Sequence, residues 1–426
     1  MEFQTLKRSH LKRNIIIGVV CIAIISAVVL NFTRAKYRTT QSIPLVNGTI
    51  NYELSDLNLI GVYIEDGNDY TRVDQIPDSG YTFNSEKSYC KIGDEKQDMT
   101  ITYDMNAKNL TIAPMTKKGT KCYLYFDKKT TLKDTILANN SVNSGTPNFA
   151  NTATTDEGVY KTQDDWGDSY YFRGAVNNNW VKFANFYWRI IRINGDGSIR
   201  MIYQGTSANT TGTGTQLQTN AFNSSYNRSE YVGYMYTSGQ QHGNTTNSPI
   251  KTIIDNWYSS NLASYADKIS TEAGFCGDRE MSSGYSWSSQ PSSAIYYAGY
   301  RRLYTNKSPS LKCSNSNDLY TSSSSSKGNK KLANPMGLIT ADEVVMAGGS
   351  RSSENSNYYL YNNVNYWTIS PLGSDGSDAS VFRVYSNGTL NYWSVSFAIG
   401  VRPVINIASN VAIKSGNGSS STPYEI

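Results

Sequence analysis

The feature that most constrains the fold is a turn signal near the C-terminus, Asn387-Gly388, which lies between two strand-like runs. Side chains alternate in character from Val381 to Tyr385, as a strand with two different faces requires. The run from Leu390 to Val395 follows as its partner. Glycine adopts positive φ without steric cost and asparagine nearly so, which favours a tight turn. The sequence therefore predicts an antiparallel hairpin here.

Two further stretches are predicted to be strands at the two ends of the same domain. Near the start, Trp180 to Ile193 turns through Asn194 to Gly197 into Ser198 to Tyr203. Near the end, Val401 to Ile407 is a last apolar run. Pro403 has no N–H to donate, so this strand is expected to begin there or to lie at a sheet edge.

The order of three C-terminal segments carries a family resemblance. Tyr366 to Ser370, Ala379 to Val384 and Gly400 to Val404 resemble the C-terminal core of C-type-lectin-like domains in bacterial surface proteins. They are also similar to the closing segment of the formylglycine-generating-enzyme (sulfatase-modifying factor) superfamily. Gly337 to Ala347 resembles the Leu-Pro-Thr-x-x-Glu-Trp helix of that superfamily. The resemblance covers residues 165–408 and implies an α+β C-type-lectin-like domain whose opening hairpin pairs with its closing strands.

The activity of that enzyme superfamily is not expected here. Its enzymes use a pair of cysteines shortly before the terminal arginine motif, whereas no cysteine follows Cys313 in this chain. Of the two histidines, His10 lies in the N-terminal stub and His242 in a loop-like segment, where we expect a solvated side chain. A lone histidine lacks the nucleophile and the orienting acid that covalent catalysis needs. We therefore predict no catalytic residues and no cofactor.

Two turns place carboxylates among glycines, Asn194 to Ser198 and Ser374 to Asp378. Calcium binding would explain them, but the spacing of an EF-hand loop with its distal glutamate is missing. Turn chemistry is the preferred interpretation, and no metal site is predicted.

Aromatic and amide side chains around the predicted hairpin form the expected binding surface. In C-type-lectin-like proteins that vary their ligands, exposed side chains near the terminal hairpin do the binding. The chain has 33 Tyr against 12 Phe, and tyrosine with asparagine and serine is typical of adaptable binding surfaces. The competing explanation is that many tyrosines are simply good strand formers. The expected binding residues are Tyr359, Tyr361, Asn362, Asn363, Asn365, Asn391, Tyr392 and Trp393.

An apolar run from Ile15 to Leu30, extended by Phe32, follows a basic N-terminal stub. This length is close to the roughly 17 residues that a spanning helix needs at least. We expect a signal anchor that crosses the cell membrane once, with the following domains outside. The alternative is a cleaved signal peptide, although Thr33 to Ala35 is a poor cleavage site. The net charge of +5 is mild and includes no basic run interleaved with aromatic residues, so nucleic acid is not an expected partner.

Five cysteines are present, and Cys21 lies in the apolar run. The other four form two groups along the chain, and an even count in an exported protein favours disulfides. The predicted bonds are Cys90–Cys122 and Cys276–Cys313. Three pairings are formally possible, and four free thiols in a cytosolic protein are the alternative to any of them.

Helix signals and tryptophans complete the expectations for the larger domain. Ser248 followed by Pro249 favours a helix start, and Thr340 with Glu343 forms a capping box. We also expect Trp188, Trp257 and Trp367 to be core residues, because large aromatic side chains bury much area.

The chain is thus divided into a stub, a membrane span, an Ig-like all-β module, a linker, a C-type-lectin-like domain and a tail. The predicted boundaries are 1–14, 15–32, 42–127, 128–164, 165–408 and 409–426.

The function that follows is a membrane-anchored bacterial surface protein that binds an extracellular protein or glycan. One alternative is an enzyme of the formylglycine-generating-like superfamily with an altered site. The other is a structural subunit of the cell envelope.

Overall fold

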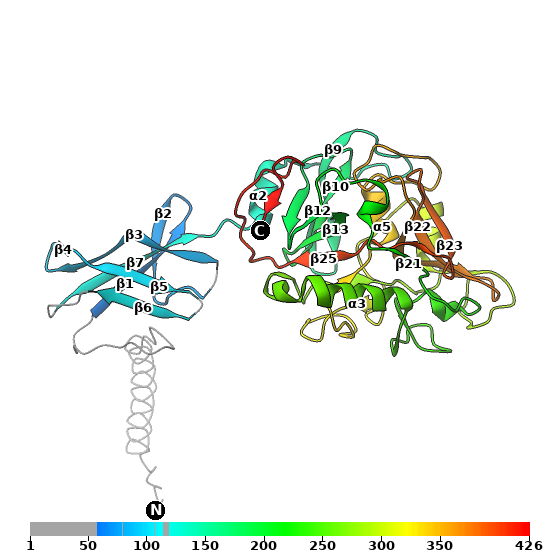
Figure 1. Cartoon of the computed structure of the whole chain (residues 1–426), viewed down its shortest axis with the longest axis horizontal. Helices are drawn as coiled ribbons and strands as arrows, with labels where there is room; N and C mark the ends of the chain where they lie inside the picture. The colour runs from blue at the N-terminus through cyan, green and yellow to red at the C-terminus, as the bar shows by residue number, and fades with distance from the viewer. Residues whose placement is uncertain (1–57, 79, 106, 114–118) are drawn as a thin grey trace, which may run out of the picture. The chain divides into compact units, whose positions relative to one another are not determined.

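A computed structural model describes residues 58–426 except 79, 106 and 114–118. The chain divides into two compact units, Met1–Lys129 and Thr130–Ile426 (Figure 1). The predicted stub and membrane span lie outside the described residues. Within the described part, no helix is both long and apolar enough to cross a membrane.

The first unit is all-β where it is described. One sheet has the strand order β2-β1-β7-β3-β4, in which only β1 and β7 are parallel, and β5 and β6 form a separate hairpin. Alternate residues Cys122, Leu124 and Phe126 of β7 are buried in a small core with Ile101 of β5. The strands are β1 (Asn58–Asp66), β2 (Asp69–Val73), β3 (Tyr81–Ile92), β4 (Glu95–Gln97), β5 (Thr100–Asp104), β6 (Asn109–Ala113) and β7 (Lys121–Lys128).

Both predicted disulfides are present in the structure. Cys90 and Cys122 are opposite residues of the neighbouring strands β3 and β7. Cys276 and Cys313 are bonded within the second unit. Each bond closes a loop inside one unit, which limits the freedom of the unfolded chain.

The first sheet of the second unit joins the opening and closing parts of the domain. Its strands β13 and β25 are antiparallel neighbours, with Ile199 opposite Ile407, so the predicted pairing of the opening hairpin with the closing strand is confirmed. Strand β25 begins directly after Pro403, as expected from the missing N–H. In sheet order, the strands are β20 (Met336–Gly337), β25 (Val404–Ile407), β13 (Ile199–Gly205), β12 (Phe186–Ile193), β10 (Gly167–Gly174), β9 (Asp156–Asp164) and β8 (Val142–Asn143).

The stretch predicted as one strand from Trp180 to Ile193 is a hairpin instead. Strand β11 (Trp180–Phe183) pairs antiparallel with β12. Between them Ala184 and Asn185 have φ of 53° and 65°. The aromatic and β-branched residues on both sides make the run resemble one strand, although Asn185 is of a residue type that adopts positive φ readily.

The predicted linker, residues 128–164, is wrong, because this segment belongs to the second unit. It forms the capped helix α2 (Leu132–Asn139) and strands β8 and β9. Strand β9 pairs with β10 along its length, although most of its side chains are polar and only Val159 and Asp164 are buried. Its polar composition resembles that of a loop because one face of the strand meets solvent.

The predicted tail, residues 409–426, is also part of this unit and packs beside α2 (Figure 1). Its strand β26 (Tyr424–Glu425) pairs with β11. Tyr424 is fully buried, and its hydroxyl accepts a hydrogen bond from Asn139 Nδ2 at 3.1 Å. The domain therefore extends at both ends beyond the predicted 165–408.

The second sheet carries the predicted C-terminal hairpin, β22–β23. Its turn is a five-residue loop rather than a two-residue one: Tyr385 N donates to Thr389 O at 2.9 Å. Gly388 has φ of +84°, and a Cβ there would lie 1.8 Å from Asn355 O. In sheet order, the strands are β14 (Thr219–Asn220), β24 (Ile399–Gly400), β21 (Tyr366–Ser374), β22 (Ala379–Val384) and β23 (Leu390–Ser394), with β18 (Ile295–Tyr296) pairing with β21.

Both predicted helix starts are confirmed. Ser248 caps α3 (Pro249–Asn261) with proline in the first turn, and Thr340 and Glu343 form the capping box of α5 (Ala341–Met346). The remaining short elements are η1 (Gly212–Thr215), η2 (Ser229–Val232), β15 (Met235–Tyr236), β16 (Thr246–Asn247), η3 (Ala263–Lys268), β17 (Phe275–Cys276), α4 (Ala298–Tyr300), η4 (Arg301–Thr305) and β19 (Leu319–Tyr320).

The tryptophans behave largely as expected. Trp188 and Trp367 are fully buried in the main core, and Trp257 packs against this core while partly exposed. Trp367 Nε1 also donates to Asn220 O at 2.9 Å, so the polar atom of this buried side chain has a hydrogen-bond partner.

Replacing Trp367 with Ala is predicted to lower the free energy of unfolding by about 3–5 kcal/mol, because it leaves a large cavity. Chemical denaturation monitored by circular dichroism measures the change. Trp393→Ala, at a ring that is 41% exposed, is the matched control and should cost far less. Equal stabilities of the two variants would contradict the placement of Trp367 in the core.

Candidate functional site

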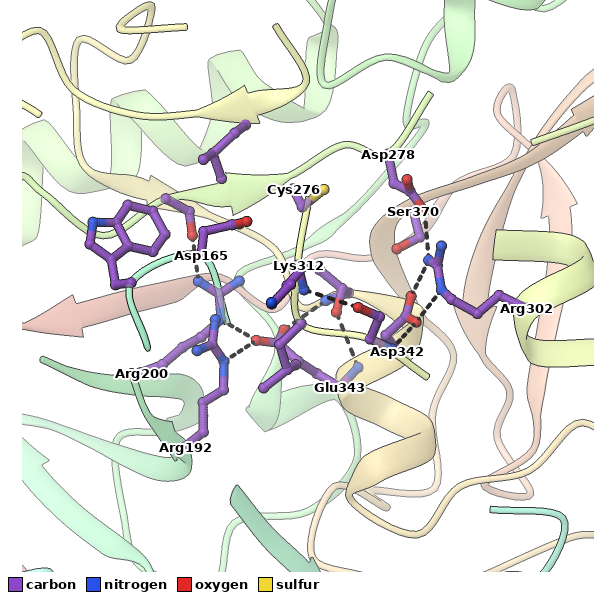
Figure 2. A pocket seen from close by; sticks show the side chains of 16 residues that line it. Asp165, Arg192, Arg200, Cys276, Asp278, Arg302, Lys312, Asp342, Glu343 and Ser370 are labelled. Atoms are coloured by element: carbon purple, nitrogen blue, oxygen red, sulfur yellow. Dashed lines mark hydrogen bonds and ion pairs between the residues drawn. The ribbon is translucent and has the colours of Figure 1, made fainter. Parts of the chain in front are cut away.

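A charged pocket lies between the two sheets of the second unit and the start of α5 (Figure 2). It contains about 440 Å³ of empty space, part of it open to solvent. Arg192 and Arg200 reach it from β12 and β13, Arg302 comes from η4, and Asp342 and Glu343 come from the first turn of α5. A pocket with so many ionisable groups is the first place to look for chemistry.

Glu343 is the centre of an ion-pair network on one side of the pocket. Its Oε1 accepts from Arg192 Nε at 2.9 Å and lies 2.6 Å from Arg200 Nε, the latter as an ion pair without hydrogen-bond geometry. Its Oε2 accepts from Thr340 N at 2.9 Å. Burial by itself would raise the pKa of Glu343, but Arg200, Arg192 and the Thr340 N–H together hold it below its ordinary value.

The other side of the pocket has a second cluster, in which one arginine faces two carboxylates. Arg302 binds Asp342 through two parallel hydrogen bonds of 2.7 and 2.8 Å. Its Nη2 also donates to Asp278 Oδ2 at 2.6 Å. These ion pairs connect α5 to β12, β13 and η4. Asp165, which also lines the pocket, is not paired with an arginine of the described residues, and burial raises its pKa. The pocket is best explained as a structural ion-pair network.

His242 is not the solvated side chain that was predicted. It is partly buried, and its Nδ1 lies 2.9 Å from Oδ2 of the buried Asp318. Asp318 also pairs with Arg279 at 2.7 Å. The other ring nitrogen, Nε2, lies 3.6 Å from Glu280 Oε1. The histidine thus joins two carboxylates and does not form the nucleophile–base pair of a hydrolase.

No group of three or more His, Cys, Asp or Glu side chains that could hold a metal ion occurs among the described residues. The two glycine-rich turns use their carboxylates locally. Asp196 Oδ1 accepts from Ser198 N at 2.9 Å, and Asp375 Oδ1 accepts from Asp378 N at 2.8 Å. Both are turn contacts.

Exposed aromatic side chains gather instead on the C-terminal hairpin. Tyr385, Tyr392, Trp393 and Phe397 are each 37–53% exposed. The other large apolar side chains with comparable exposure in the described part of the chain are Val142, Tyr226 and Tyr285. Four exposed aromatic rings thus lie within 13 consecutive positions, Tyr385 to Phe397. Exposed apolar side chains on a protein surface are usually scattered singly, so such a cluster indicates an interaction site.

The period of the strands separates these rings into two faces. Arg383 is opposite Asn391 and Val381 is opposite Trp393, whereas Phe382 is opposite Tyr392. Successive strand residues point to opposite faces, so Tyr392 lies on the other face from Asn391 and Trp393. We call the group formed by Arg383, Tyr385, Asn391, Trp393 and Phe397 the Arg383 patch.

The Arg383 patch has a defined internal geometry. The guanidinium carbon of Arg383 lies 4.3 Å from the Trp393 ring centre and 4.7 Å from that of Tyr385, within the range of cation–π contacts. Phe397 packs edge-on against Trp393, with ring centres 5.4 Å apart. Tyr385, Arg383, Trp393 and Phe397 thus contact one another in that order and form one continuous patch.

The structure contradicts the prediction that two of the expected binding residues contact a ligand. Tyr359 is 5% exposed, with its ring against Arg189, and Asn362 is 2% exposed, with its Nδ2 donating to Thr215 Oγ1 at 2.6 Å. Asn365 has a supporting role, because its Oδ1 accepts from Ser386 N at 2.9 Å and thereby holds the hairpin loop. All three lie just before β21, where the chain turns inward.

The remaining expected residues are accessible but do not form one surface. Tyr361 and Asn363 contact each other at 3.3 Å in the loop before β21. Asn391 and Trp393 belong to the Arg383 patch, while Tyr392 faces the other way. Arg383 and Phe397 were missed, although the period of two already placed Arg383 on the face of Tyr385.

No protein-family model matches the chain, and no curated protein or solved structure shows a significant match to it. The geometry of the described residues therefore carries the functional argument.

Replacing Glu343 with Gln is predicted to lower the free energy of unfolding at pH 7 by about 3–5 kcal/mol, because two buried arginines lose their carboxylate. The pKa of Glu343 is lowered in the folded state from its ordinary value of 4.5. Its stabilising contribution is therefore present above pH 4.5 and is lost as the pH falls through the folded pKa.

Denaturation of wild type and Glu343→Gln between pH 7 and pH 3 tests this, and the gap between them should narrow at acid pH. Asp267→Asn, at an exposed carboxylate of the same unit, is the control and should follow wild type. A gap that stays constant across this range would contradict the role of the ionised carboxylate.

Proposed function

We propose that the chain is a recognition protein of the bacterial cell surface, anchored in the membrane through residues 15–32. Its second unit, Thr130–Ile426, acts as a C-type-lectin-like ligand-binding domain. The Arg383 patch on hairpin β22–β23 is the site that contacts an extracellular ligand, a protein or a glycan. The observation that carries this proposal is the concentration of exposed rings around a buried cation on one hairpin.

The hairpin is held rigidly, which favours binding. Its loop is fixed by Ser386 N donating to Asn365 Oδ1, and by Asn387 Nδ2 donating to Glu354 Oε1 at 2.6 Å. Strand β23 is tied at its start by Leu390 N donating to Ser350 O at 2.9 Å. A surface that is ordered before binding loses less conformational entropy when the ligand arrives.

The enzyme alternative receives less support from the geometry. The charged pocket is the natural place for an altered active site. Its arginines are, however, matched by Asp164, Asp278, Asp342 and Glu343 at 2.6–2.9 Å. A general acid or base needs a group free to exchange a proton with substrate, and these four carboxylates are held by arginines. Asp165 is a lining carboxylate that no arginine in the described part of the chain holds, and its Oδ2 accepts from Cys313 N at 3.0 Å.

The structural-subunit alternative would use the free edge of β23 for strand addition between copies. On that edge, Tyr392 N donates to Asn391 Oδ1 at 2.8 Å and Leu390 N donates to Ser350 O. Edge donors that are already engaged are poor templates for a further strand. Side-chain recognition is therefore favoured over assembly through this edge.

The double variant Tyr385→Ala/Trp393→Ala is predicted to fold and to lose ligand capture by about tenfold or more, since buried aromatic anchors dominate binding energy at interfaces. Capture by the full-length chain, purified in detergent, is measured on protein and glycan arrays. Thermal unfolding of the same samples reports folding.

The matched control is Tyr285→Ala, because Tyr285 and Tyr385 are equally exposed at 37% but Tyr285 lies outside the patch. It should capture ligand as wild type does. Unchanged capture by the folded double variant would move the site away from this hairpin and overturn the proposal.

A further inference from the structure

Arg383 differs from the other buried arginines of the described residues in having no hydrogen-bond acceptor. It is 5% exposed, and its Nε is a fully buried atom without a partner. The others each donate to a carbonyl or a carboxylate. These are Arg173, Arg189, Arg192, Arg200, Arg279 and Arg402.

The contacts that Arg383 does make are with the two rings of the patch. Tyr385 and Trp393 cover its guanidinium while remaining 37% and 41% exposed themselves. Of its three guanidinium nitrogens, only Nε is among the fully buried atoms that lack a partner. Neither Nη atom makes a hydrogen bond within the described part of the chain, so both retain some contact with solvent.

An unpaired guanidinium at this depth lacks the acceptors that it normally has. Burial lowers the pKa of Arg383, because a desolvated guanidinium loses part of its hydration. A guanidinium has five N–H donors in a planar fork that matches a carboxylate through two parallel hydrogen bonds. Such a fork fits an anionic, planar acceptor that arrives from outside.

The surroundings of Arg383 favour a polypeptide over a glycan as the source of that carboxylate. Sugars are recognised through many hydrogen bonds to hydroxyls, but several amide and hydroxyl groups of the hairpin are already engaged internally. Asn387 Nδ2 donates to Glu354, Thr389 Oγ1 donates to Asn387 at 2.8 Å, and Asn391 Oδ1 accepts from Tyr392 N. The exposed remainder is aromatic, and Tyr, Trp and Arg are the residues enriched at protein-interface hot spots.

We propose that the Arg383 patch binds an acidic polypeptide segment. An Asp or Glu carboxylate of the partner lies on Arg383, and apolar side chains flanking it lie on Tyr385, Trp393 and Phe397. The aromatic rings exclude water from the ion pair, which strengthens it relative to a pair in open solvent. This inference rests on the proposed function and assigns a ligand class to that site.

The test uses the full-length chain and three immobilised probes. These are a glutamate–tyrosine copolymer as an acidic apolar polypeptide, poly-L-glutamine as the uncharged polypeptide, and hyaluronate as a carboxylated glycan. Surface plasmon resonance gives the affinities of wild type, Arg383→Gln, Arg383→Lys and the control Arg351→Gln. Arg351 is a matched control because it is exposed and also stacks on a ring, Tyr304, at 3.9 Å.

Wild type should bind the glutamate–tyrosine copolymer more tightly than the other probes. Arg383→Gln should weaken this binding about tenfold or more, as the loss of one charge-assisted pair implies. Arg383→Lys, which keeps the charge without the planar fork, should be intermediate. Arg351→Gln should match wild type, which separates a specific pair from attraction of a polyanion to a basic protein.

Failure of this inference is distinguishable from failure of the proposed function. If the copolymer is not bound, or binds equally to Arg383→Gln and wild type, the acidic-polypeptide assignment is overturned. If hyaluronate is the preferred probe and depends on Arg383, the ligand is a glycan and the assignment is likewise overturned. If Tyr385→Ala/Trp393→Ala abolishes binding but Arg383→Gln does not, the hairpin is the binding site, and the pairing of Arg383 with a ligand carboxylate is overturned. If neither variant changes the affinity, the proposal that the Arg383 patch is the binding site is overturned as well.

Discussion

The buried carboxylate of Glu343 is the interaction on which the second unit depends most. It caps its own helix through Thr340 and at the same time neutralises Arg192 and Arg200 from two neighbouring strands of the first sheet. Helix α5 is too short to be stable alone. Its position is therefore set by ion pairs and by the burial of both its polar and apolar side chains. Arg302 extends the same network through Asp342.

The pocket and the proposed binding site differ in how their charges are partnered. The pocket concentrates ionisable groups, and most of its arginines and carboxylates pair with one another and thereby connect α5 to its surroundings. The hairpin β22–β23 presents few charges, and its one buried cation is left unpaired. Polar side chains of the loop are used to fix the backbone, and the rings are left exposed. A rigid backbone that displays rings around a cation is suited to recognition, because little ordering is needed when a partner binds.

The elements that the sequence predicted correctly share a local cause. Alternation predicted β22 and β23, the missing N–H of Pro403 predicted the start of β25, and side-chain chemistry predicted the caps at Ser248 and Thr340. Local patterns fail where burial depends on distant partners. Strand β9 has a largely polar sequence without a strand pattern, and it is a strand because it pairs with β10. The C-terminal segment gives no local signal because its strand β26 pairs with β11, more than two hundred residues earlier in the chain.

The candidate site was only partly predictable for the same reason. Aromatic character identified Trp393 and Tyr392, but only the pairing register shows that they face opposite sides of β23. Composition could not show that Tyr359 and Asn362 are buried, since both residue types are common on surfaces and in cores. The unpaired state of Arg383 is a property of its three-dimensional neighbours alone.

Hydrogen–deuterium exchange of the full-length chain, with and without a captured ligand, tests the central claim most directly. The account predicts that ligand slows exchange in peptides covering residues 379–397 and leaves the pocket segments around 310–312 and 340–346 unchanged. Protection confined to the pocket segments, with no change at the hairpin, would contradict it.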